Sequence, residues 1–300
     1  MFYLCLMFNV IFLLFWLRLW SAPEKEFYFN PFLSGTIKLT DSVIAFLRPV
    51  LYMPEQAAAL VILLFLTVFK TLLVVRLNLT WNITLGTYFM FAPARAENLP
   101  HLLLFSVLHV AAFLARLWTV YLLVKLITPP FRTTRATEAL AFFARPFSRL
   151  PSLTQPFVLF ALHVALAFIL SRTGALSVLA QPLEAPKPAL ASPFTEGPLY
   201  LQLLRTGWLG ALSFADGLML LTRGLFVLIV GNLGAAILQA RGAAIICGEG
   251  AELLMGRFAR RNTVGMGFDF TPLIYFFVVD LLYNSVCRSL YELIHSPFLR

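Results

Sequence analysis

Long apolar segments recur along this chain of 300 residues, and they limit its fold more than any other feature. About six of them approach the roughly twenty residues that a helix needs to cross a bilayer. They occupy residues 2–20, 55–77, 101–128, 155–171, a stretch that ends near residue 238, and 271–290. Backbone groups in lipid must bond within their own segment, so apolar segments of this length fold as helices. The sequence predicts an all-α, polytopic membrane protein.

Composition supports this fold class. Hydrophobic residues make up 60% of the chain and charged residues only 12%, about half the charged share of a soluble domain. The first apolar segment has no basic region before it and exceeds the length of a typical signal-peptide core, so we expect a retained first helix.

The fifth segment is longer than one crossing requires. Residues 199–238 are mostly apolar but contain Arg205, Asp216 and Arg223. A single helix crosses the bilayer in about half this length. We therefore expect an interfacial helix followed by a span that starts near Gly217.

The chain repeats a pattern of span, broken amphipathic segment and span. Residues 30–32, Asn-Pro-Phe, follow the first span, and residues 128–131, Thr-Pro-Pro-Phe, follow the third. An Arg-Pro pair then precedes the next span in both places, at Arg48-Pro49 and at Arg145-Pro146. Such self-similarity indicates duplication of one structural element. We predict three units: residues 1–77, a divergent middle unit 78–198 with a Pro-rich connector, and 199–300.

Basic residues predict the orientation of these units. The semi-polar segments at 21–54, 129–154 and 241–270 together hold about eleven Lys and Arg, whereas the connectors 78–100 and 172–198 hold about three. Cytoplasmic segments carry the excess of positive charge. We expect the three semi-polar segments in the cytoplasm, lying in the membrane interface, and the connectors on the other side with both termini.

The net charge of +9 indicates that the chain binds a negatively charged partner. Because no Lys/Arg cluster alternates with aromatic residues on a soluble domain, we expect anionic lipid head groups and no direct binding of nucleic acid. A membrane-protein partner or a second copy of the chain is the other partner we consider.

Charged side chains inside the spans need partners, because each costs about 2.5–3.5 kcal/mol at a helix centre. Arg18 lies near a span end, where snorkelling to the head groups is the simplest interpretation. Arg116 lies deeper, and its Arg-Leu-Trp sequence repeats the one that begins at Arg18, which indicates a shared structural role. We expect Asp280 to be the countercharge of Arg116 or of Lys70, in a structural ion pair rather than an ion path.

His109 and His163 lie in neighbouring spans within similar sequences, Leu-His-Val-Ala. If they face each other, they could bind haem or a metal, or relay a proton. Packing histidines with hydrogen bonds are the simpler interpretation, so we predict no cofactor. Three separated cysteines and the absence of hydrolase or phosphate-binding motifs indicate neither a zinc site nor an enzyme.

A glycine-containing segment precedes the last span. Gly265 and Gly267 allow a tight turn, Asp269 can accept amide hydrogens at the helix start, and Pro272 suits the first helical turn. We interpret the segment as a turn that leads into a capped helix.

Two sets of residues resemble the YggT family of small bacterial membrane proteins, which are related to the plastid YlmG proteins. The first set is residues 27–32, Phe-Tyr-Phe-Asn-Pro-Phe, with residues 37–41 and Leu47-Arg48-Pro49. The second is the basic run with Arg260 and Arg261, followed by residues 266–272, Met-Gly-Phe-Asp-Phe-Thr-Pro. The chain departs from the family in Met266, in Thr263 and in its length, so the resemblance implies a diverged member with an extra repeat. Its family-motif residues would be Asn30, Pro31, Phe32, Arg48, Pro49, Arg260, Arg261, Gly267, Asp269 and Pro272.

The resemblance implies a location and a set of processes. It implies a multi-pass protein of the bacterial inner membrane that acts as a scaffold or assembly factor in cell division or envelope organisation. Alternatives within the family are osmotic tolerance with potassium uptake, and haem or cytochrome assembly. None of these activities is enzymatic.

Overall fold

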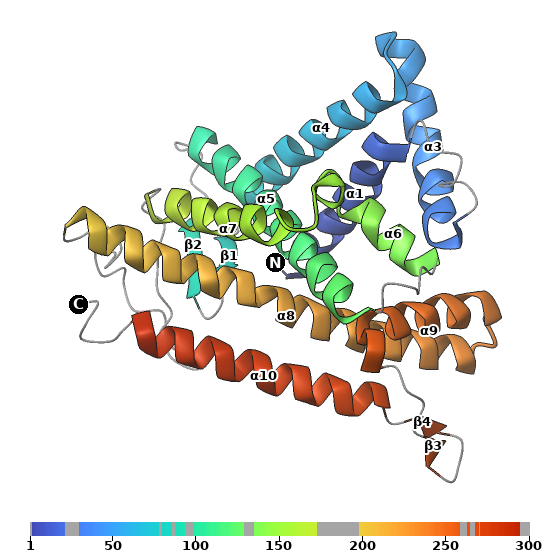
Figure 1. The fold of residues 1–300 in the computed structure, drawn as a ribbon. Coiled ribbons are helices and arrows are strands. Elements are labelled where there is room, and N and C mark those ends of the chain that lie inside the picture. Colours follow the sequence, from blue (N-terminus) through green and yellow to red (C-terminus); the bar gives the residue numbers. More distant parts are fainter. Residues whose placement is uncertain are drawn as a thin grey trace.

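The computed structural model describes residues 2–21, 30–77, 80–85, 88–93, 99–128, 135–172, 198–258, 263–264, 268–269 and 271–294. Helices make up most of this part of the chain, which confirms the predicted helical fold (Figure 1). The long helices form three pairs that pack side by side, α1 (Phe2–Ser21) with α4 (Glu55–Arg76), α5 (Leu99–Ile127) with α7 (Gln155–Arg172), and α8 (Leu199–Ile237) with α10 (Thr271–Ile294).

An amphipathic helix joins the two members of each pair. We call these three the linking helices: α3 (Pro31–Leu51), α6 (Arg135–Phe143) and α9 (Arg241–Met255). Short 3-10 turns follow the second and third of them, η2 (Phe147–Arg149) and η3 (Gly256–Phe258). Each pair therefore consists of one helix that leads into a linking helix and one that leads out of it.

Four helices are long and apolar enough to cross a membrane: Glu55–Arg76, Leu102–Ile127, Leu199–Ile237 and Thr271–Leu290. Two further apolar helices in the described part of the chain, Met7–Trp20 and Gln155–Leu170, are shorter. Of the six expected spans, four thus have helices long and apolar enough to cross a membrane, and the other two have shorter apolar helices.

The fifth predicted segment differs from its expectation. Instead of an interfacial helix and a separate span starting near Gly217, the structure has one continuous helix, α8, of 39 residues. At about 1.5 Å per residue it is about 58 Å long, nearly twice the hydrocarbon thickness. The charge that was expected to break it, Asp216, is fully buried beside an arginine, so it does not need to reach the bilayer surface. The C-terminal part of α8 packs on α9, and it continues past the end of α10 (Figure 1).

Two short antiparallel hairpins, which were not expected from the sequence, add to the helices. Strand β1 (Thr80–Leu85) pairs with β2 (Tyr88–Pro93) in the first connector, and β1 lies beside α5 and α8. Strand β3 (Thr263–Val264) pairs with β4 (Phe268–Asp269) just before α10. The second hairpin occupies the segment that was predicted to be a turn.

The apolar core follows the helix pairs. One cluster joins α5, α7 and α8 through Phe105, Leu166 and Leu212, and a second joins α5, α8 and α9 through Leu225 and Leu254. A separate cluster holds α1, α3 and α4 together, with Phe15, Ile44, Ala58, Ala59 and Ile62 as buried members. Helix α5 contacts α4, α7 and α8, so it connects the first pair to the rest of the bundle.

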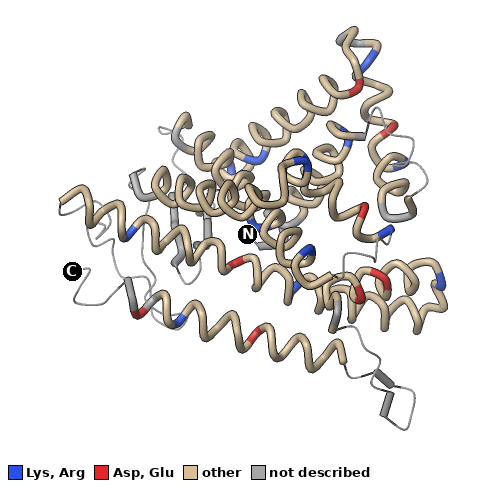
Figure 2. The backbone as a smooth tube through the Cα atoms, in the orientation of Figure 1, with Lys and Arg blue, Asp and Glu red and all other residues tan. Residues whose placement is uncertain are grey.

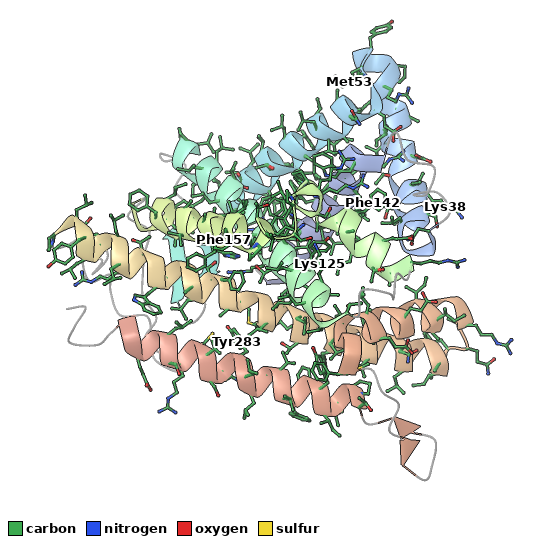
Figure 3. All side chains as sticks on the ribbon, viewed as in Figure 1. Lys38, Met53, Lys125, Phe142, Phe157 and Tyr283 are labelled. Carbon is green, nitrogen blue, oxygen red and sulfur yellow. The ribbon has the colours of Figure 1, made fainter. Side chains whose placement is uncertain are left out.

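Large apolar side chains also cover the outside of the long helices. Leu64 on α4 is 60% exposed, Phe157 on α7 is 76% exposed and Leu281 on α10 is 71% exposed. Figure 3 labels Phe157 on its helix. A soluble monomer rarely exposes apolar faces of this kind over several helices, whereas acyl chains accept them.

The linking helices gather at one end of the bundle. Helix α3 contacts α6, and α6 contacts α9, so the three form a continuous row. Figure 1 shows them on the right of the molecule, and Figure 2 shows charged positions of both signs along them. Figure 3 shows Lys38 at the outer side of α3. The row brings together segments more than a hundred residues apart in the sequence.

Candidate functional site: a buried polar centre and three linking helices

An ion pair lies at the centre of the bundle. Arg116 on α5 places its Nη2 atom 3.0 Å from Oδ2 of Asp216 on α8, which has no exposed surface. The phenol of Tyr283 on α10 donates a hydrogen bond of 3.2 Å to Oδ1 of the same carboxylate. Figure 3 shows Tyr283 between α10 and α8. Asp216 thus joins three helices and compensates the charge of Arg116 away from water.

A second set of polar contacts lies one helical turn away. His163 on α7 has Thr119 Oγ1 3.0 Å from its Nε2 atom and Ser213 Oγ 2.8 Å from its Nδ1 atom. Thr119 follows Arg116 by three residues on α5, and Ser213 precedes Asp216 by three on α8. Three helices therefore meet at His163, and both of its ring nitrogens have partners within the bundle.

Two glycines of α8 make these contacts possible. A Cβ atom at Gly217 would lie 2.3 Å from Cγ2 of Thr119, and one at Gly210 would lie 2.8 Å from the Cα atom of Val164 on α7. Larger residues here would hold α5 and α7 away from α8, so the polar side chains could not meet.

Sequence reasoning missed Asp216, Ser213 and these glycines as members of one site. The available signal was a glycine every seven residues, at positions 210, 217, 224 and 231, which marks one face of a helix. The glycines at 224 and 231 face Leu254 and Cys247 of α9. The same face of α8 thus continues beyond the polar centre, by which we mean Arg116, Asp216 and His163 with their contacts.

Asp280 is not the countercharge that the sequence predicted. Arg116 pairs with Asp216, and Lys70 places its Nζ atom 3.1 Å from Nδ1 of His109. Asp280 instead accepts a hydrogen bond of 3.1 Å from Asn284 on its own helix. The prediction was wrong because Tyr283, not Asp280, occupies the face of α10 that meets Asp216.

Polar side-chain contacts also connect α4 to α5. Lys70 of α4 is buried against His109 of α5, and one turn earlier Ser106 donates a hydrogen bond of 3.3 Å to the carbonyl of Thr67. The two histidines that were considered as a facing pair thus have different partners: His109 contacts α4, while His163 contacts α5 and α8.

Arg18 does not snorkel to a surface, which corrects its predicted role. It is 3% exposed and lies beside the carboxylates of Asp41 on α3 and Glu55 on α4, the latter at 3.1 Å. Arg18 and Arg116 occur in the same Arg-Leu-Trp sequence, and each neutralises a carboxylate from another helix. Arg76, in contrast, is exposed at the end of α4.

The Asn-Pro-Phe motif begins the first linking helix and attaches it to the second. The carbonyl of Asn30 accepts the amide hydrogens of Leu33 and Ser34, and α3 starts at Pro31, where the missing amide hydrogen costs nothing. The buried side-chain amide of Asn30 donates a hydrogen bond of 2.7 Å to the carbonyl of Arg135 at the start of α6. Phe32 lies in the first turn of α3.

The Arg-Pro elements lie near the ends of the linking segments. Arg48 and Pro49 are exposed at the end of α3, and Arg149 is exposed at the end of η2. The guanidinium of Arg145 lies 3.9 Å from the ring centre of Phe142, and its backbone carbonyl accepts a hydrogen bond from the indole of Trp16 on α1.

Lys125 connects the two helices that flank the second linking helix. Its Nζ atom lies 3.0 Å from both Ser152 Oγ and Gln155 Oε1, so it ties the end of α5 to the start of α7 (Figure 3). In the third unit, Pro272 lies in the first turn of α10 and Asp269 ends β4. Arg260, Arg261 and Gly267 lie outside the described residues.

Chemically, the polar centre suits structure more than ligand binding. Arg116, Asp216 and His163 have partners in neighbouring helices. Among the described residues no three His, Cys, Asp or Glu side chains gather into a group that could hold a metal ion.

Comparison of the chain with models of protein families, with curated proteins and with solved structures gave no match. The resemblance to the YggT family stays a prediction that rests on the motif residues.

Proposed function

We propose that this chain is a non-catalytic, multi-pass membrane protein that acts as a scaffold or assembly factor. One observation carries the proposal: three linking helices from three successive units contact one another in a row at one end of the bundle. A row of this kind offers a continuous surface to a partner, while the long helices hold it against the membrane.

The membrane position follows from length and surface chemistry. Four helices are long and apolar enough to cross, and their outward faces are apolar. The excess of Lys and Arg in the linking segments supports a cytoplasmic position for the row. The resemblance adds the bacterial inner membrane, and cell division or envelope organisation as the process.

The contacts with lipid or partner would come from the basic residues of the linking segments. These are Arg48, Arg145 and Arg149, together with Arg257, Arg260 and Arg261 near the third linking helix. Arginines beside a membrane attract anionic head groups, at about 1 kcal/mol per residue. If they only set the orientation of the chain, replacing them will invert the topology instead of weakening partner binding.

Photo-crosslinking in native membranes tests the scaffold proposal. A photoreactive residue at Lys38, which is exposed on α3, should capture a specific protein, and one at Leu64 on the apolar face of α4 is the matched control. Capture of one partner from position 38 and not from position 64 supports the proposal, and a second copy of this chain would be an equally specific partner. The same adducts from both positions, or none from either, would contradict it.

Potassium uptake is the alternative that one observation favours: charged side chains of several helices meet inside the bundle. Flux in liposomes should be compared between the wild type and Asp216→Asn, with Asp280→Asn as the control at a position that is not fully buried. Flux that depends on Asp216 would contradict the scaffold.

Haem or cytochrome assembly is the remaining alternative from the resemblance. Both ring nitrogens of His163 already have hydrogen-bond partners, so the geometry does not favour it as an axial ligand. A Soret band after haem titration of the purified protein, lost in His109→Ala, would establish this alternative instead.

A further inference from the structure

A groove lies where the C-terminal end of α1 meets the N-terminal end of α4 and η2. Its volume is about 370 Å³, and it is lined by Leu19, Trp20, Gln56, Ala57, Leu60 and Arg149. We propose that this groove binds one anionic phospholipid, with its phosphate at Gln56 and Arg149 and an acyl chain along α4. The inference rests on the proposed membrane function, because it needs the linking segments at the lipid surface.

The polar end of the groove has the chemistry of a phosphate site. Arg149 and Gln56 are both exposed, and a guanidinium can donate two parallel hydrogen bonds to phosphate oxygens. The neighbouring carboxylate of Glu55 lies 3.1 Å from Arg18, so its charge is already matched within the protein. Trp20 forms a wall, and tryptophan is the side chain that favours the boundary between head groups and acyl chains.

The apolar end of the groove continues along the outside of α4. Leu60, Leu64, Val68 and Leu72 follow one another at intervals of four residues and are 50%, 60%, 44% and 49% exposed. Side chains with this spacing form one ridge on a helix. The ridge extends about 18 Å, comparable to half of the roughly 30 Å hydrocarbon core. A free phosphate would use only the polar end, so this continuous apolar surface favours a lipid.

A second, more open groove supplies a matched control. It has a volume of about 430 Å³ and is lined by Ala45, Arg48, Pro49, Tyr52 and Met53 of the first linking segment. Arg48 and Arg149 are both exposed arginines next to the membrane-crossing helices. Diffuse attraction to anionic lipid would use them equally, whereas a specific groove would not.

Native mass spectrometry of the full-length protein in detergent tests the inference. The protein is titrated with phosphatidylglycerol and with phosphatidylcholine of the same acyl chains. We expect the wild type to prefer phosphatidylglycerol, and Arg149→Gln to lower that affinity about tenfold, the effect of losing one charge-assisted hydrogen bond. A neutral detergent micelle has no anionic surface potential, so the diffuse attraction that Arg48 would contribute at a membrane is absent in this assay. Arg48→Gln should therefore stay within about twofold of the wild type, since it leaves this groove intact.

A second variant guards against misfolding as the cause. Ala57→Trp fills the groove without removing a charge, so it should weaken both lipids while the thermal unfolding temperature stays near that of the wild type. Equal losses in Arg149→Gln and Arg48→Gln would overturn the inference. So would no preference for phosphatidylglycerol, or competition by glycerol phosphate as strong as that of the intact lipid.

The two proposals fail separately. Partner capture at Lys38 with no lipid preference would refute the groove and leave the scaffold intact. A lipid preference that depends on Arg149, with no captured partner, would refute the scaffold and leave the groove.

Discussion

Arg116 and Asp216 illustrate how a charge can lie inside an apolar bundle. Asp216 is completely buried, and its two carboxylate oxygens contact Arg116 and Tyr283 from two other helices. Both charges would be unfavourable alone at this depth, so each makes the other tolerable. The pair therefore couples the packing of α5, α8 and α10.

Removing one partner tests this coupling. Asp216→Asn leaves the partly buried Arg116 beside a neutral amide, so we expect a loss of about 3 kcal/mol in the free energy of unfolding. Unfolding in mixed micelles, followed by far-ultraviolet circular dichroism, measures it. Asp280→Asn is the control and should change stability by less than about 0.5 kcal/mol, because Asp280 is not fully buried and accepts its hydrogen bond from Asn284 on its own helix. Equal losses in both variants would show that Asp216 has no special role.

Arg18 and Arg76 form a second matched pair of arginines near span ends. Arg18 is buried between Asp41 and Glu55, whereas Arg76 is exposed. We expect Arg18→Met to cost about 3 kcal/mol, because it leaves the partly buried Glu55 without its cation. Arg76→Met should cost less than about 0.5 kcal/mol. The same unfolding assay measures both losses. Similar losses in unfolding free energy for Arg18→Met and Arg76→Met would restore the snorkelling interpretation of Arg18.

At the scale of the element, α8 organises the bundle. Its glycine face meets α7 at Gly210, α5 at Gly217, and α9 at Gly224 and Gly231. One helix can contact three neighbours so closely only where it lacks side chains. These close contacts lie on both sides of Gly217, near which the sequence predicted the start of a separate span, and α8 is one helix of 39 residues through all of them.

Alanine substitutions test the glycine face. Gly210→Ala places a methyl group 2.8 Å from the backbone of Val164, which cannot move aside without shifting α7, so we expect a loss of about 1–3 kcal/mol. Gly234→Ala has open space around it and should be neutral, or stabilising by up to about 1 kcal/mol through helix propensity. Unfolding midpoints of the two variants against the wild type measure the difference. A neutral Gly210→Ala would mean that α7 and α8 are not in close contact.

The sequence predicted elements better than contacts. Apolar length located the long helices, and the Asn-Pro and Arg-Pro motifs located the segments between them, because these signals are local. The partner of Arg116 was not predictable in this way: Asp216 and Asp280 are both single acids in apolar segments, and only helix rotation and packing distinguish them. The β1/β2 hairpin had a local signal that was missed: polar Thr80, Asn82 and Thr84 alternate with apolar Trp81, Ile83 and Leu85, which is the period of a strand.

At the scale of the whole molecule, the three helix pairs are all connected at the same end of the bundle. Each first helix ends at a linking helix and each second helix begins there, so α3, α6 and α9 lie at the same end (Figure 1). The hydrogen bond from Asn30 to Arg135 and the one from Trp16 to Arg145 fix the first unit to the second at this end. The row can be a single surface only if all three linking helices face one side of the membrane.

Cysteine labelling in intact cells decides that orientation. In a background without Cys5, Cys247 and Cys287, single cysteines replace Gly35 on α3, Glu138 on α6 and Gly248 on α9. Gly35 and Gly248 have open space for a side chain, and Glu138 is exposed. Tyr200→Cys, exposed at the start of α8, reports the opposite end of the bundle.

A membrane-impermeant maleimide should label position 200 in intact spheroplasts. Positions 35, 138 and 248 should react only after the membrane is permeabilised, because the proposed orientation, based on the excess of Lys and Arg, has the linking helices in the cytoplasm. Labelling of all three without permeabilisation would invert the orientation but keep the row. Labelling of one or two of them would place the linking helices on different sides, and the proposed common surface would not exist.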